Sequence, residues 1–274
     1  MEDNGRVDLS VPSAARMYDW LLGGHNNFAA DQEACQLLLE AAPSTKALAL
    51  NNRWFLQRVV RALAEEHQIR QFVDFGSGLP TQNNVHQIAQ SVHDDAHVVY
   101  IDNDPVVLAH GRSILDDSTK TGIIAADMAD TEYIFGHEEM RRLIDPERPV
   151  AVLFNSVLHC IPDAKDPLGI VRRTLRKLAQ SDNFVVICQL VSEDKHLRDE
   201  VTNLMFEQTH DNWGRVREVA DVKGYFEGLE VQPPGLVDVT DWRPESELQQ
   251  KQRSIEWIEF GGLARVPAAV ASKF

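Results

Sequence analysis

The hydrophobic and polar positions of this 274-residue chain follow two different patterns, one before and one after about residue 68. In the first part, apolar residues recur every three to four positions, which predicts amphipathic helices. Pro12 suits the first turn of a helix and Gly23-Gly24 suits its end. Two further helices are expected over 29–42 and 45–66, so the chain is predicted to begin with a helical segment.

Beyond this segment, short runs rich in Val, Ile and Phe alternate with helical stretches. Near-continuous apolar strands that alternate with helices predict a mostly parallel sheet covered on both faces. Helices are expected near 82–92, 105–115, 131–143, 166–180, 194–210 and 215–227. Strands are expected over 70–75, 97–102, 121–126, 149–155, 183–191, 229–239 and 253–262. We predict an α/β fold with seven strands, the last one antiparallel, in which a helical cap over residues 1–68 packs on a core over residues 69–274 as one structural domain.

One expected strand ends in a loop that suits a bound ligand. The apolar run 71–75 contains Asp74, and Gly76, Ser77 and Gly78 follow it directly. Glycine permits a positive φ and lacks the Cβ that would keep a ligand away from the backbone. A carboxylate beside this loop suits a ligand with an amine or a sulfonium better than a bare pyrophosphate, because like charges repel at short range.

Polar residues also follow the next three expected strands. Ligands of open α/β sheets bind outside the carboxyl ends of the strands, so these residues are expected around one crevice. Asp102 is placed to accept hydrogen bonds from both hydroxyls of a ribose, or it precedes the helix that Pro105 begins. Asp127 suits the exocyclic amine of adenine, or a plain turn. The other candidates for cofactor or substrate contact at these ends are Asn103, Met128, Asn155 and Ser156.

Two cofactors compete for this crevice. A dinucleotide-binding loop has the pattern G-x-G-x-x-G, but Thr81 stands at the third glycine position here. The pattern Asp-x-Gly-x-Gly, followed by Asp102 and Asp127 at the next strand ends, favours S-adenosylmethionine, whose amino group and sulfonium are cationic. The residues therefore predict S-adenosylmethionine, with S-adenosylhomocysteine as product, and leave a nicotinamide-dependent oxidoreductase as the alternative.

In these segments the chain resembles a bacterial family of S-adenosylmethionine-dependent methyltransferases, formerly catalogued as a domain of unknown function and common in actinomycete-type genomes. The matching segments are 12–31, 72–81, 98–109 and 157–159, and the resemblance extends from about Pro12 to Val266. It implies a class I methyltransferase fold, which is Rossmann-like, with a helical N-terminal extension. It implies no particular methyl acceptor. The chain departs from the family at His25, where a lysine is expected, so an anion contact there would depend on pH.

The N-terminal segment supplies further candidates. Polar and flexible residues gather between the first two expected helices, and N-terminal segments of class I methyltransferases often fold over the cofactor. We predict a lid over the methionine end of the cofactor, with Tyr18 at the site and Arg16 or Asn26 near the carboxylate. The alternative is that Gly23-Gly24 only ends a helix and that Asp19 caps it or forms a surface pair.

The candidate general base is His159, which follows the fourth expected strand. The same residue, within the apolar run 157–161, also fits a structural histidine. Proton removal need not require a strong base, because alignment of the nucleophile with the methyl group supplies much of the rate. The other histidines lack the spacing of metal ligands, and no metal site is predicted.

Composition narrows the range of partners. The net charge of -15 repels phosphate backbones, so non-specific nucleic-acid binding is not expected and a small-molecule substrate is. Three dispersed cysteines suggest reduced thiols, and no run is long enough to cross a membrane. We expect a cytoplasmic methyltransferase, with a non-catalytic S-adenosylmethionine-binding module as a further alternative. The oligomeric state cannot be inferred from these features.

Overall fold

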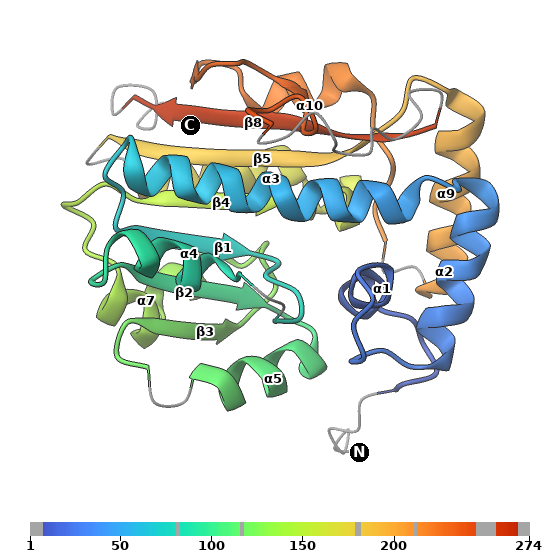
Figure 1. Cartoon of the computed structure of the whole chain (residues 1–274), viewed down its shortest axis with the longest axis horizontal. Helices are drawn as coiled ribbons and strands as arrows, with labels where there is room; N and C mark the ends of the chain where they lie inside the picture. The colour runs from blue at the N-terminus through green and yellow to red at the C-terminus, as the bar shows by residue number, and fades with distance from the viewer. Residues whose placement is uncertain are drawn as a thin grey trace.

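The apolar runs form the centre of the computed structural model, which describes residues 8–80, 83–115, 118–178, 182–210, 213–244 and 256–267 (Figure 1). Among these residues the sheet has eight strands, in the order β3-β2-β1-β4-β5-β8-β6, with β7 also paired to β8. The five strands β1 to β5 are parallel, and β8 runs antiparallel to β5. The strand bounds are β1 Gln71–Phe75, β2 His97–Asp102, β3 Thr121–Ala125, β4 Ala151–Asn155, β5 Asn183–Val191, β6 Glu230–Val231, β7 Val237–Asp238 and β8 Ile258–Val266.

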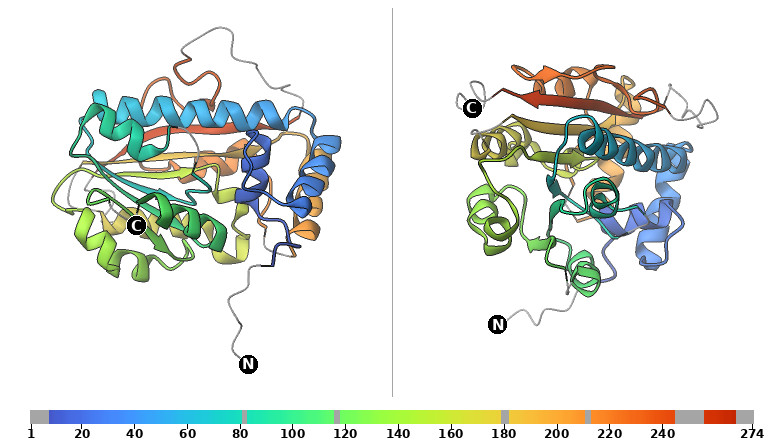
Figure 2. Two further views of the ribbon diagram at one scale, coloured as in Figure 1. Left: turned by 60° about the horizontal axis from the view of Figure 1, so that its bottom comes forward. Right: turned by 60° about the vertical axis from the view of Figure 1, so that its left-hand side comes forward.

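Helices cover both faces of the sheet because its strands are apolar on both sides. On one face, buried residues of α3 and α4 pack against alternate residues of the strands. On the other face, buried residues of α6, α7, α8 and α10 do the same. The right-hand view of Figure 2 separates these two helical layers. The helices are α3 Thr45–Glu65, α4 Val85–Val92, α5 Pro105–Leu115, α6 Thr131–Gly136, α7 Glu138–Leu143, α8 Pro167–Lys177 and α10 Val219–Tyr225.

A third group of helices lies beyond the carboxyl ends of the parallel strands (Figure 1). This end layer consists of α1 (Ala14–Leu21), α2 (Ala29–Ala41) and α9 (Lys195–Gln208). Its buried residues form a separate apolar cluster that includes Met17, Leu38 and Met205. Two short 3₁₀ turns, η1 (Leu158–Cys160) and η2 (Asp163–Lys165), follow β4 at the same end of the sheet. Although α3 precedes the sheet in sequence, it packs on the face of the sheet rather than in the end layer.

The predicted α/β fold with a mostly parallel sheet and a long antiparallel last strand is confirmed, and several element boundaries differ. The expected strand 229–239 is two short strands, β6 and β7, because Pro233 and Pro234 between them have no N–H to donate to a ladder. The expected helix 131–143 is divided at His137, whose Nδ1 accepts a hydrogen bond from Glu139 N (3.2 Å) and so begins α7.

Two further differences lie near the C-terminus. The last strand begins at Ile258 and ends at Val266, later than the expected 253–262, and residues 251–255 lie outside the described part. The expected helix 215–227 begins only at Val219, because Arg217 forms a parallel β-bridge with Val191 of β5. The expected helix 82–92 begins at Val85, and residues 82 and 179–180 lie outside the described part. None of the described helices combines the length and the apolar character needed to span a bilayer.

Candidate cofactor and acceptor site

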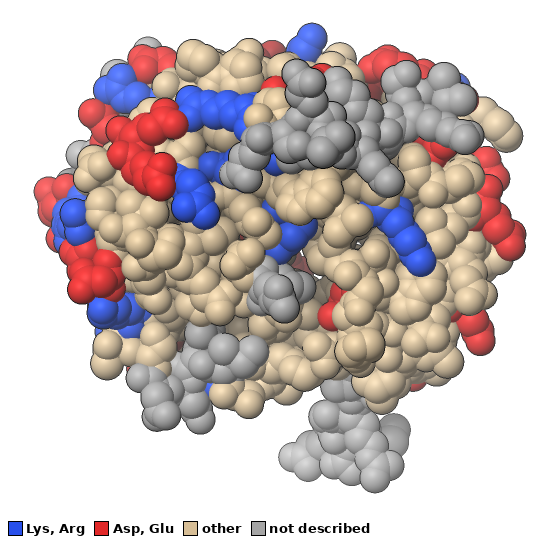
Figure 3. Space-filling view, viewed as in Figure 1, with Lys and Arg blue, Asp and Glu red and all other residues tan. Residues whose placement is uncertain are grey.

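A cavity of about 460 Å³ lies between the carboxyl ends of the parallel strands and the helices α1 and α3. Figure 3 shows the surface hollowed near the middle of the face seen in Figure 1, with basic and acidic side chains interspersed around it. The cavity has two halves. The strand-end half is lined by the loops after β1, β2, β3 and β4, and the helical half is lined by α1, α2, α3, α9 and residues near Trp213 and Trp257. Cavities of this size usually hold small molecules.

The loop after β1 is shaped by two glycines with positive φ. Gly76 has a φ of 68° and Gly78 a φ of 65°. A Cβ at Gly76 would lie only 2.3 Å from Val157 Cγ2, so no larger residue fits without displacing Val157. The N–H groups of Gly76 and Ser77 both donate to Ile101 O, at 2.8 and 3.2 Å. The loop is therefore fixed against β2, and it lies along the cavity wall.

Asp74 is the buried carboxyl group of this half. Its side chain is 5% exposed and lines the cavity. Burial raises the pKa of Asp74 to about 7, Arg53 opposes the rise, and the carboxylate of Asp102 adds to it. No hydrogen bond from another described residue contributes to this pKa. A buried carboxyl group that faces a cavity without a donor is suited to receive one from a ligand.

Asp102 lies at the end of β2 and holds the glycine loop. Its Oδ2 accepts a hydrogen bond from Gly78 N, and its Oδ1 accepts one from Asp104 N, both at 2.9 Å. Each carboxylate oxygen has two lone pairs, so both can accept a further hydrogen bond from a ligand. Burial raises the pKa of Asp102, and the two backbone N–H groups oppose that rise. The second interpretation of Asp102, as a residue that orders the start of α5, is compatible with this geometry.

Asp127 and Met128 occupy the outer edge of the strand-end half. Asp127 Oδ2 forms an ion pair with Lys165 Nζ at 2.8 Å, and its Oδ1 accepts a hydrogen bond from Ala129 N. These partners lower the pKa of Asp127 against the effect of partial burial. Met128 is buried against the sheet and also lines the cavity, so both of its expected roles are compatible with its position.

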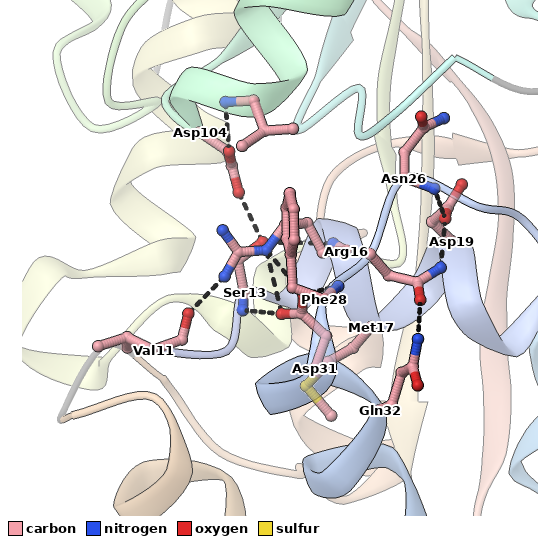
Figure 4. A network of polar contacts seen from close by, with 12 residues as sticks. Val11, Ser13, Arg16, Met17, Asp19, Asn26, Phe28, Asp31, Gln32 and Asp104 are labelled. Carbon is pink, nitrogen blue, oxygen red and sulfur yellow. Dashed lines mark hydrogen bonds and ion pairs between the residues drawn. The ribbon is translucent and has the colours of Figure 1, made fainter. Parts of the chain in front are cut away.

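A polar network joins the end layer to the strand-end half (Figure 4). Arg16, which is buried, forms an ion pair with Asp31 at 3.0 Å and donates to Val11 O. Ser13 N donates to Asp31 Oδ1 at 3.0 Å, and Ser13 Oγ donates to Asp104 Oδ2 at 2.5 Å. The start of α1 is thereby fixed to the loop after β2, directly over the cavity.

These residues fit a nucleoside that carries a cationic amino-acid tail, because they offer an open acceptor at Asp74, spare acceptor capacity at Asp102 and a glycine loop free of side chains. A model of the S-adenosyl methyltransferase family matches residues 1–267. The chain belongs to this family. Its cofactor is S-adenosylmethionine.

Two solved structures are similar to this chain over nearly its whole length. A protein from Thermobifida fusca, provisionally assigned as a methyltransferase, has a TM-score of 0.84 and 35% identity, covering 95% of this chain and 97% of that one. A DUF574 family protein from Streptomyces avermitilis has a TM-score of 0.86 and 34% identity, covering 96% and 100%. The trans-methyltransferase CalH, solved with SAH, has a TM-score of 0.50 at 14% identity over 86% and 63%, which shows the fold alone. No curated protein sequence matches the chain.

The cavity brings together nearly all of the candidate residues named from the sequence. Asn26 is the exception, because it does not belong to the cavity lining. Its backbone N–H and the side chain of Asn27 instead donate to Asp19 Oδ2, each at 2.8 Å. The loop at Gly23-Gly24 is therefore fixed by Asp19, which is buried within α1 and does not form the surface pair that the alternative interpretation named. The candidates that line the cavity are Arg16, Tyr18, Asp74, Gly76, Ser77, Gly78, Asp102, Asn103, Asp127, Met128, Asn155, Ser156 and His159.

The surroundings of His159 favour a structural role over that of a base. Burial and the nearby Arg217 lower its pKa to about 3, so the ring is neutral at physiological pH. Leu190 N donates to His159 Nδ1 at 3.4 Å, which places the ring proton on Nε2. In this tautomer neither ring nitrogen is free to accept a proton from a substrate. The ring also packs against Trp213, with the centroids 5.2 Å apart.

Several lining residues carry no motif and were missed in the sequence. Arg53 of α3 lowers the pKa of Asp74, and Lys165 forms an ion pair with Asp127. Glu259 of β8 is a fully buried acid at the cavity. The signal available in the sequence was weak, since a lone Glu in an apolar strand reads as an exposed position. The remaining missed residues are in the helical half and include Met17, Leu38, Leu48, Asn52, Leu190, Met205 and Trp257.

Proposed function

We propose that this protein transfers the methyl group of S-adenosylmethionine to a small-molecule acceptor that binds in the helical half of the cavity. The observation that carries the proposal is that one cavity joins the two halves. The strand-end half presents Asp74, Asp102 and the glycine loop, and the helical half presents mainly apolar side chains. A cofactor in the first half leaves the second half for an acceptor.

Different strand-end residues suit different parts of the cofactor. We assign the ribose hydroxyls to Asp102, the α-amino group to Asp74 and the adenine to Asp127 and Met128. Arg53 lies near enough to Asp74 to lower the pKa of that carboxyl group, and so suits the carboxylate of the same amino-acid tail. Arg16 lines the cavity too, but Asp31 already neutralises its charge, so Arg53 is the stronger candidate for the carboxylate.

The reaction requires orientation more than acid–base chemistry. When bound, the cofactor supplies an electrophilic methyl group on a sulfonium. The protein holds the acceptor in line with that group, and the apolar side chains of the helical half exclude water from it. Because His159 is a poor proton acceptor, we do not assign it the role of base. The acceptor is instead selected by the walls of the helical half.

Calorimetric titration with S-adenosylhomocysteine and with NAD tests the cofactor assignment. We expect saturable binding of S-adenosylhomocysteine and no binding of NAD at the same concentration. The second step incubates the protein with methyl-labelled S-adenosylmethionine and a low-molecular-mass extract of cells, and we expect label in an extract component. NAD binding in place of S-adenosylhomocysteine would contradict the proposal. Cofactor binding without any transfer would favour a non-catalytic binding module.

A further inference from the structure

Glu259 is a buried acid that the cofactor does not require. It lies on β8 opposite Leu190 of β5, on the face of the sheet that the helical half of the cavity uses. Its side chain is 0% exposed, its Oε1 accepts a hydrogen bond from Ser156 Oγ, and no described residue donates a hydrogen bond to Oε2. A buried carboxyl oxygen without a donor costs free energy, and such an atom in a native protein calls for an explanation such as a bound ligand or a catalytic role.

The partner of Glu259 is held in an unusual conformation. Ser156 follows β4 and has a φ of 56°, which is the left-handed region that non-glycine residues rarely adopt. Its N–H donates to Cys188 O at 2.9 Å, which fixes the backbone while the hydroxyl is directed at Glu259. Strained residues of this kind concentrate at ligand sites. Ser156 and Glu259 thus form a preformed polar pair at the cavity.

Glu259 does not take part in a structural ion pair with any of the described residues. No Lys or Arg of the described chain forms a salt bridge with Glu259. Burial raises the pKa of Glu259 to about 8, the neighbouring Ser156 and Cys188 oppose the rise, and Asp238 adds to it. Replacement of a buried charged group by an apolar residue of similar size is often neutral or stabilising, because a buried acid without a cation costs desolvation energy. Stability therefore does not explain why a glutamate stands here.

Aromatic side chains line the same half of the cavity. Trp257 precedes Glu259 by two residues, and Trp213 packs on the neutral ring of His159. Both indole rings are buried, and neither ring N–H has a partner among the described residues. Aromatic side chains of this kind favour contact with a planar ligand. Asp74 and Asp102 elsewhere in the cavity disfavour an anionic one.

We propose that Glu259 and Ser156 anchor the methyl acceptor, and that the acceptor is a small, planar, uncharged molecule with a hydroxyl or amino group that donates a hydrogen bond to Glu259. This inference rests on the proposed function, since it assigns a ligand class to the acceptor half of the same cavity. The hydrogen-bond donor of the ligand satisfies Oε2, and its ring lies among the walls that include Trp213 and Trp257.

Three fluorinated probes test this assignment by ¹⁹F NMR on the full chain, with and without saturating S-adenosylhomocysteine. The probes are 4-fluorophenol, 4-fluoroaniline and 4-fluoroanisole, and the last has no hydrogen-bond donor. We expect saturable binding of the phenol, the aniline or both, and at least tenfold weaker binding of the anisole. The probe that binds more tightly distinguishes a hydroxyl acceptor from an amine.

Variants then separate a ligand-binding role from a structural one. In Glu259→Leu we expect at least a tenfold loss of binding of the better probe, S-adenosylhomocysteine affinity within about twofold, and a thermal midpoint equal to or above that of the wild type. Glu200→Leu, at an exposed position of α9, is the matched control and should change neither affinity. Ser156→Gly suits a φ of 56°, so it keeps the fold and should weaken probe binding several-fold.

The outcomes separate this inference from the proposed function. If S-adenosylhomocysteine does not bind but a donor probe binds in a Glu259-dependent manner, the subsite stands and the cofactor assignment fails. If S-adenosylhomocysteine binds and the three probes bind equally or not at all, the acceptor assignment is wrong. It is also wrong if Glu259→Leu lowers the thermal midpoint and Ser156→Gly leaves probe binding unchanged, because both results indicate a purely structural glutamate.

Discussion

The two halves of the cavity are built in different ways. The strand-end half consists of loops that follow consecutive parallel strands, and its polar groups are backbone amides and the carboxylates that orient them. The helical half takes isolated side chains from α1, α2, α3, α9 and the chain near β8, and most of these are apolar. A local motif can therefore encode the cofactor site, whereas the acceptor site exists only after the end layer has packed. Membership of the family accordingly identifies the cofactor and leaves the acceptor open.

The largest expected effect is the destabilisation of α1 and α2, which line the helical half. Asp31 is buried and accepts hydrogen bonds from Ser13 N, Arg16 Nε and Phe28 N. Asp31→Ala leaves the Arg16 guanidinium buried without its carboxylate, which costs about 3–5 kcal/mol. We expect hydrogen exchange of α1 and α2 to accelerate by a corresponding factor, while exchange in β1 and β2 changes little.

Glu33→Ala is the control for this experiment, because it removes a carboxylate from the exposed side of the same helix. It should leave exchange in both regions near that of the wild type. Equal acceleration in α1, α2 and the parallel strands of Asp31→Ala would show that the two halves unfold as one unit, and the division between them would then have no energetic meaning.

The next effect concerns the strand-end half. Asp102→Ala removes the acceptor that we assign to two ribose hydroxyls, and charge-assisted hydrogen bonds of this kind contribute about 2–3 kcal/mol. The affinity for S-adenosylhomocysteine should fall by a factor on the order of 30 to 150, measured by calorimetry. Circular dichroism should show that the variant remains folded.

Two further variants sharpen this measurement. Asp102→Asn keeps the shape of the side chain and one acceptor oxygen, so its loss of affinity should be intermediate. Asp94→Ala removes an exposed carboxylate from the loop before β2 and should leave the affinity unchanged. An unchanged affinity in Asp102→Ala would remove Asp102 from the cofactor site and restrict it to ordering the loop.

The same contrast between the halves explains what the sequence could predict. Asp74, Gly76, Gly78 and Asp102 lie within or just after strands that are recognisable as apolar runs, and parallel topology brings such ends together. Asn26 lies outside the cavity lining, and the lid was preferred for it because polar residues beside Gly23-Gly24 are compatible with a lid as well as with a helix end. Only the hydrogen bonds to Asp19 in the folded chain distinguish the two.

Glu259 and Ser156 could not be paired from the sequence, because 103 positions separate them. The same limit applies to the fold. Long apolar strands such as β5 were predicted with the right bounds, whereas the short strands β6 and β7 depend on pairing with β8 for their existence. Elements with a clear local sequence pattern can therefore be predicted from the sequence, and short elements that form only by pairing with distant segments cannot.

The smallest predicted effect is a pH dependence that belongs to the strand-end half. Burial raises the pKa of Asp74 to about 7, so this carboxyl group is mostly protonated at pH 6 and mostly ionised at pH 8. Only the ionised form pairs with the cationic amino group of the cofactor, so the affinity for S-adenosylhomocysteine should rise about tenfold between pH 6 and pH 8. Adenosine lacks the amino-acid tail, and its affinity should change much less over this range. In Asp74→Asn the dependence should disappear for both ligands. A tenfold rise that persists in Asp74→Asn would assign the titration to another group, such as Asp102, whose pKa is also raised and whose carboxylate raises that of Asp74.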